Sequence, residues 1–131
     1  MANVKILRKG IMPLRKLKVT INNDTFFLKG NESKLLTIPN GSHNLILRMD
    51  FWQSIYQINI NSEENYIIIK HYLPDFFYII GIVFTIVFAL LTFFSLISHI
   101  LFTGFLLLFI LPQLYLYLFR NKNYFFLNLN E

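Results

Sequence analysis

The sequence predicts a small all-β antiparallel sandwich of about six strands, followed by a two-span transmembrane α-helical hairpin. The helical prediction comes from residues 76–119, which contain no Asp, Glu, Lys or Arg. The β prediction comes from residues 17–70, where short β-branched and aromatic runs alternate with clusters of Asn, Gly, Ser and Asp. That alternation is typical of strands joined by tight turns. The net charge of +5 is concentrated at the two ends of the chain.

The region 17–70 divides into six candidate strands, at about 17–21, 25–28, 34–38, 43–49, 54–60 and 66–70. Asn40-Gly41 lies between two of them, and Asn-Gly is among the strongest hairpin signals. The core of such a region is small, so we expect docking on the hairpin or on another protein to help stabilise it. The side chains expected to point inward are Val19, Ile21, Phe26, Leu28, Leu36, Ile38, Leu45, Leu47, Ile58, Ile60, Ile67 and Ile69.

Two short motifs stand out in this region, one at a strand end and one around the Asn40-Gly41 turn. They consist of Val19, Ile21, Asn22 and Asn23, and of Ile38, Pro39, Gly41, His43, Leu45 and Leu47. These motifs resemble the PEGA family of small β-sandwich domains, in which a strand of the form V-x-I-(N/D)-(G/N) leads to a hairpin of the form (L/I)-P-x-G-x-(H/Y)-x-(I/V/L). The family's later Gly-Tyr pair is absent here, and Phe51-Trp52 is the nearest substitute. The resemblance implies a surface or interaction module and brings no catalytic residues.

The uncharged stretch is too long for one membrane span. A single helix over 76–119 would extend about 66 Å at roughly 1.5 Å per residue, whereas the hydrocarbon core of a bilayer is about 30 Å thick. We therefore expect two spans, at about 76–96 and 100–119, with a turn at Ser98-His99. Pro74 and Asp75 suit the start of the first helix, because a carboxylate in the first turn complements the helix dipole.

Five residues in the spans are candidates for helix packing. Gly81, Thr85 and Ala89 recur every four residues, and a stripe of small side chains lets another helix approach closely. The same three could equally be unrelated small residues. Pro112 removes one helix hydrogen bond and predicts a bend. Gln113 could bond to the freed backbone, to the first span or to a partner protein, and simple structural satisfaction is the favoured interpretation.

Residues 1–16 form a basic N-terminal arm without the apolar run of a secretory signal. Its basic side chains could contact anionic lipid headgroups. Alternatively, the arm is a solvated terminus or an extra edge strand. Aromatic side chains are not interleaved with the basic ones, so nucleic acid is not expected as a partner. The candidate lipid-headgroup contacts are Lys5, Arg8, Lys9, Arg15, Lys16, Lys18, Arg120 and Lys122.

The basic residues also predict an orientation. Lys70 precedes the first span, Arg120 and Lys122 follow the second, and the connecting turn has no Lys or Arg. The positive-inside rule therefore places both termini on the cytoplasmic side of the cell (inner) membrane. The tail 120–131 contains the apolar run 124–127. It could lie in the membrane interface, pair with an edge of the β-region or dock on another subunit.

The sequence contains no recognisable set of catalytic, cofactor-binding or metal-binding residues. It has no Cys, and His43, His71 and His99 are far apart. We therefore expect a non-enzymatic integral membrane accessory or interaction protein. The alternative is a small homo-oligomeric channel or transporter component, with Gln113 among the residues lining a polar path. Expected partners are membrane lipids, and other membrane-protein subunits or further copies of the chain.

Overall fold

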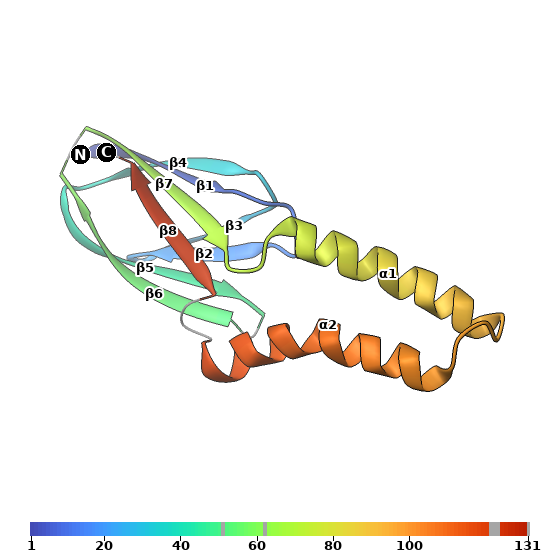
Figure 1. The fold of residues 1–131 in the computed structure, drawn as a ribbon. Helices are drawn as coiled ribbons and strands as arrows, with labels where there is room; N and C mark the ends of the chain where they lie inside the picture. Colours follow the sequence, from blue (N-terminus) through green and yellow to red (C-terminus); the bar gives the residue numbers. More distant parts are fainter. Residues whose placement is uncertain (51, 62, 121–123, 131) are drawn as a thin grey trace.

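The computed structural model describes all residues except 51, 62, 121–123 and 131. It shows a β-sandwich from which a pair of long helices extends (Figure 1). This layout confirms the predicted β-region followed by a helical hairpin, with eight strands in place of about six. In order, the elements are β1 Ala2–Arg8, β2 Leu17–Ile21, β3 Asp24–Leu28, β4 Ser33–Ile38, β5 Gly41–Met49, β6 Trp52–Ile60, β7 Glu64–His71, α1 Asp75–Phe93, α2 His99–Phe119 and β8 Phe125–Asn130.

The strands form two four-stranded sheets. The first has the order β4-β1-β7-β8 and the second the order β3-β2-β5-β6. Neighbouring strands are antiparallel except β1 and β7, which run parallel from Asn3 beside Glu64 to Arg8 beside Ile69. Both β1 and β7 therefore run towards the hairpin, and β8 runs back from it.

The two additional strands, β1 and β8, come from the segments that the sequence analysis placed outside the β-region. β1 lies between β4 and β7, so residues 2–8 are neither a solvated arm nor an edge strand. The reason is a two-residue alternation, in which Ala2, Val4 and Ile6 are fully buried while Asn3 and Lys5 are exposed. The boundary at residue 17 was therefore wrong, and the sandwich begins at Ala2.

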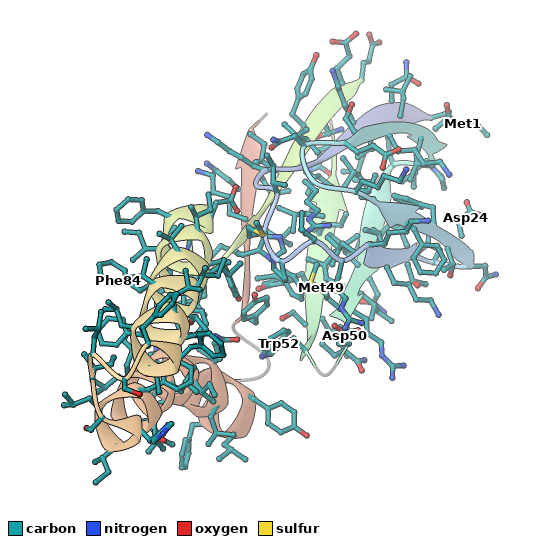
Figure 2. All side chains as sticks on the ribbon, turned by 90° about the vertical axis from the view of Figure 1, so that its right-hand side faces the viewer. Met1, Asp24, Met49, Asp50, Trp52 and Phe84 are labelled. Carbon is teal, nitrogen blue, oxygen red and sulfur yellow. The ribbon has the colours of Figure 1, made fainter. Side chains whose placement is uncertain are left out.

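The two sheets enclose one hydrophobic core. Of the twelve side chains expected to point inward, eleven are buried and Leu36 is partly buried against them. The core continues to the end of the sandwich that faces the helices, where Figure 2 shows Trp52, with Met1 and Asp24 at the opposite end. Apolar core residues that the sequence analysis missed are Ala2, Val4, Ile6, Leu17, Met49, Leu73, Tyr78, Leu116, Tyr124 and Phe125.

The helices α1 and α2 lie side by side and antiparallel (Figure 1). Both are long and apolar enough to cross a membrane, and only 17% and 6% of their most apolar segments are buried inside the protein. So little burial distinguishes them from the core helices of a soluble protein. The first helix ends three residues earlier than expected, at Phe93. The Ser98 hydroxyl caps α2 by accepting a hydrogen bond from the Leu101 N–H at 3.3 Å.

Aromatic side chains hold the two helices together. Phe77 stacks on Phe109 with ring centroids 5.2 Å apart, and Phe88 stacks on Phe105 at 4.8 Å. Gly81 faces the Phe109 ring so closely that an added Cβ would lie 1.8 Å from a ring carbon. A glycine at this position is therefore required for the observed approach of α1 and α2.

Candidate functional site at the junction of sandwich and hairpin

The hairpin is inserted between two adjacent strands of one sheet. β7 ends at His71 and leads through residues 72–74 into α1, and the chain returns from α2 into β8. His71 then lies opposite Phe125 in the β7–β8 ladder. The Tyr72 N–H donates to the Tyr124 carbonyl at 2.7 Å, extending the pairing towards the helices. Both ends of the hairpin are thus fixed to the same sheet.

Tyr124 is the centre of the junction and is fully buried. Its ring stacks on Trp52 with centroids 4.2 Å apart, and the His71 ring packs edge-on at 5.7 Å. Its hydroxyl lies 2.7 Å from the hydroxyl of Tyr78 in the first turn of α1. Burial raises the pKa of Tyr124, so its hydroxyl stays protonated and hydrogen-bonded. This residue connects the second sheet, β7 and α1.

Arg8, the last residue of β1, is also fully buried. Its guanidinium donates to the carbonyls of Leu28 at 3.1 Å and Pro13 at 2.9 Å, and to the carbonyl of Arg15. These bonds hold the loop between β1 and β2, residues 9–16, against the end of the sandwich. The prediction that Arg8 contacts lipid headgroups was therefore wrong. The sequence pattern alone could have indicated that the Arg8 side chain points inward, because Arg8 continues the alternation of Ala2, Val4 and Ile6.

His71 completes this cluster in its neutral form. Its Nε2 accepts a hydrogen bond from Arg8 Nε at 3.1 Å, which leaves the proton on Nδ1. Within the part of the chain that the structure describes, the buried Nδ1 has no hydrogen-bond partner. Burial, together with the Arg8 charge, lowers the pKa of His71 to about 4. Protonation of this ring would place a second positive charge beside a buried one.

Asp75 ties the same loop to the start of α1. Its carboxylate accepts hydrogen bonds from the N–H of Ile11 at 2.8 Å and of Met12 at 2.9 Å. The preceding Gly10 has φ +109, a conformation that disfavours other residues. Its N–H donates to the Asn31 side chain at 2.9 Å. The loop 9–16 is therefore attached to both the sandwich and the hairpin.

The remaining predicted lipid contacts differ in position. Lys9, Arg15 and Lys16 are exposed on the loop 9–16, at the hairpin end of the sandwich. Lys5 is exposed midway along β1, and Lys18 is half-buried on β2. Arg15 also forms an ion pair with Asp50 at 3.3 Å. Arg120 is the exposed C-cap of α2, and Lys122 lies outside the described residues, as does Phe51 of the PEGA comparison.

The predicted helix-packing residues are only partly engaged. Gly81 packs against α2, Thr85 is half-buried and Ala89 is exposed. The Thr85 hydroxyl donates to the Gly81 carbonyl at 2.7 Å. Gln113, next to Pro112 inside α2, donates to the Phe109 carbonyl at 3.4 Å. Because these polar groups bond within their own helices, they do not favour the channel interpretation.

Two hollows adjoin the junction and share Pro74 and Phe76 as lining residues. The first, about 400 Å³, is lined by Lys9, Lys70 and residues at the start of α1. The second, about 500 Å³, is an apolar groove between α1 and α2. It is lined also by Phe77, Ile80, Gly81, Phe105, Leu108 and Phe109. A hollow that carries two lysines and an apolar groove thus border the same two residues.

The described residues include no cluster of three or more His, Cys, Asp or Glu able to hold a metal ion. Neither a family model nor a curated protein sequence matches this chain. The sequence analysis did not identify the junction, where the buried side chains of Arg8 and Tyr124 form hydrogen bonds.

Proposed function

We propose that this chain is a non-enzymatic membrane accessory protein that holds a β-sandwich at the cytoplasmic membrane surface and contacts a larger membrane assembly. The observation that carries the proposal is the insertion of the hairpin between β7 and β8. An anchor attached through one flexible linker would leave the domain free to reorient. Two attachments to adjacent strands fix the direction in which the sandwich faces relative to the helices.

The exposed surface of the helices supports membrane anchoring. Large apolar side chains cover both of them, among them Ile100, 83% exposed, and Phe93, 80% exposed. Such a surface would be unstable in water over the whole length of a hairpin. In a bilayer the same side chains contact lipid, and the helical backbone satisfies its own hydrogen bonds.

The distribution of charge supports the cytoplasmic orientation. The loop 9–16, Lys70 and Arg120 bring basic side chains to the hairpin end of the sandwich. The turn at 94–98 contains no Lys or Arg. The positive-inside rule favours the basic end on the cytoplasmic side. The resemblance to PEGA domains, which serve as surface modules, is consistent with a recognition role for the sandwich.

Two exposed positions suit a search for partner proteins. Ala89 is the part of the small-residue stripe that α2 leaves uncovered, so another helix could approach there. Ile55 on β6 is 64% exposed on the outer face of the second sheet. A photo-crosslinking amino acid at Ala89 should capture a membrane subunit, and one at Ile55 a protein that binds the sandwich. Lys5, exposed on the other sheet, provides a control position.

The proposal is tested in native membranes. Alkaline carbonate should leave the protein in the membrane fraction, and crosslinking should give discrete adducts from Ala89 or Ile55 that mass spectrometry identifies. If carbonate releases the protein, it is not anchored in the membrane. A protein that purifies in mild detergent as a lone monomer, without adducts from either position, is not an accessory subunit.

A further inference from the structure

We propose that the junction binds one anionic phospholipid, with its phosphate in the Lys9–Lys70 pocket and an acyl chain in the groove between α1 and α2. This inference rests on the proposed membrane anchoring and adds a specific ligand to it. It comes from a pocket with two lysines and an apolar groove that share Pro74 and Phe76 as lining residues.

The pocket has the charge that a phosphate group needs. The Lys9 N–H donates to the Ile69 carbonyl at 2.9 Å, which places Lys9 beside Lys70 at the end of the β1–β7 ladder. Both lysines are exposed, so their ammonium groups can move towards a ligand. An ammonium group binds phosphate as a point charge with up to three hydrogen-bond donors.

The other titratable groups of the pocket are compatible with an anion. Among the described residues of its lining Asp75 is the one acid, and its two oxygens already accept hydrogen bonds from loop amides. His71 is neutral, and the buried Arg8 lies directly behind it. Two lysines against one hydrogen-bonded carboxylate leave an excess of positive charge at the opening.

The apolar groove adjoins the pocket at the start of α1. Pro74 and Phe76 line both hollows, and the groove then extends along α1 to Gly81. The eight residues from Pro74 to Gly81 extend over about 10 Å along the helix axis, so the groove accommodates the proximal part of an acyl chain. At Gly81 the Phe109 ring occupies the place of a side chain, and this contact ends the groove.

The position of the pocket matches the headgroup level of a membrane. Tyr72 and Phe126 stack with centroids 5.6 Å apart on the same sheet as Lys70, and both are exposed. Lys70 lies opposite Phe126 in the β7–β8 ladder. Exposed aromatic side chains next to the polar end of a span are typical of the membrane interface. A phospholipid beside them would present its phosphate to the lysines and its acyl chain to the groove.

Thermal unfolding of the delipidated protein in non-ionic detergent tests the proposal, with the fluorescence of Trp52 as signal. Saturating short-chain phosphatidylglycerol should raise the midpoint by about 5 °C, as expected for a ligand that binds only the folded state. Phosphatidylcholine of the same chain length and inorganic phosphate should raise it much less. A rise of equal size with phosphatidylcholine, or with phosphate alone, would refute a site for an anionic lipid.

Matched variants separate the two parts of the site. Lys9→Gln/Lys70→Gln should abolish the rise, and Lys9→Arg/Lys70→Arg should retain it. Lys5→Gln/Arg48→Gln removes the same charge elsewhere on the sandwich and should leave the rise unchanged.

The groove has its own pair of variants. Leu108→Phe fills the groove and should weaken the response to phosphatidylglycerol, whereas Leu118→Phe, on an exposed position outside it, should not. An unchanged response in Lys9→Gln/Lys70→Gln or in Leu108→Phe would overturn the proposal. The simplest explanation would then be that a partner helix, not a lipid, fills the groove. Carbonate extraction tests membrane anchoring separately, so failure of the lipid site and failure of the anchor are distinguishable.

Discussion

Replacing Arg8 by methionine should destabilise the sandwich more than any exposed substitution on the same strand. The change keeps a long apolar side chain in the core but removes the guanidinium, which donates to three carbonyls and to His71 Nε2. The bond to the Leu28 carbonyl is buried at both ends, whereas the others are partly accessible to water.

The magnitude follows from these four bonds. An unpaired buried carbonyl costs about 1–3 kcal/mol, and each partly accessible acceptor costs about 0.5–1 kcal/mol because water can replace the lost donor. Relief from burying the positive charge offsets part of this loss. We therefore expect Arg8→Met to lower the free energy of unfolding by about 3 kcal/mol. Arg8→Lys keeps the charge but not the planar fork of donors, and about half of the loss should remain.

Urea unfolding in mild detergent measures the effect. The single Trp, Trp52, stacks on Tyr124 and reports on the junction. Lys5→Met, exposed on the same strand, is the control and should change stability by less than about 0.5 kcal/mol. Trypsin should also cut faster after Arg15 and Lys16 in Arg8→Met, because the loop loses its attachment. If Arg8→Met and Lys5→Met unfold at the same urea concentration, Arg8 does not hold the loop and the reasoning fails.

Three further predictions concern the rest of the junction and the hairpin. His71 has a pKa of about 4 in the folded protein, against about 6.5 unfolded, so the unfolded chain takes up the proton first. The free energy of unfolding is therefore not reduced by His71 above about pH 6.5, and it falls by at most about 3 kcal/mol towards pH 4. Urea titrations of His71→Phe should not show this loss. Asp75→Ala should increase the hydrogen-exchange rates of the two loop amides that it binds about fivefold, which corresponds to about 1 kcal/mol. Unchanged rates would contradict the attachment. Gly81→Ala should lower the free energy of unfolding of the hairpin by about 1–2 kcal/mol, because the added methyl group collides with Phe109. Adding Phe109→Ala should then cost less than it does in the native chain, and strict additivity of the two changes would exclude the contact.

The elements that sequence reasoning located are those with a strong local pattern. The complete lack of charge over 76–119 identifies the hairpin without any tertiary information. The turn clusters and alternating apolar residues likewise locate β2 to β7, because each strand buries one face. Even the start of α2 is encoded locally, by the capping hydroxyl of Ser98.

The elements that it missed or left open depend on partners far away in the sequence; of the three alternatives for the tail, pairing with an edge of the β-region is the one observed. Lys5 and Arg8 made the first segment look like a solvated arm, although Val4 and Ile6 alternate with polar residues as in a strand. The tail offered an apolar run, but only its pairing with β7 distinguishes a strand from an interfacial segment. The site follows the same rule, since Arg8 binds carbonyls of the loop 9–16 and of the last residue of β3. No side-chain pattern identifies a carbonyl as a partner.

The position of β7 explains how so small a sandwich can hold a long helical hairpin. β7 lies between β1 and β8 and leads directly into α1, so it belongs to the centre of the sheet and to the base of the hairpin. Its neighbour β8 reaches the sheet only after the chain has returned through α2. The first sheet is therefore completed by a strand that requires the hairpin to have folded back. Because Tyr124 and Phe125 belong to the same core as the earlier strands, the core is complete only when the chain has returned from the hairpin. We therefore expect a change at either Arg8 or Gly81 to lower the stability of both the sandwich and the helix pair.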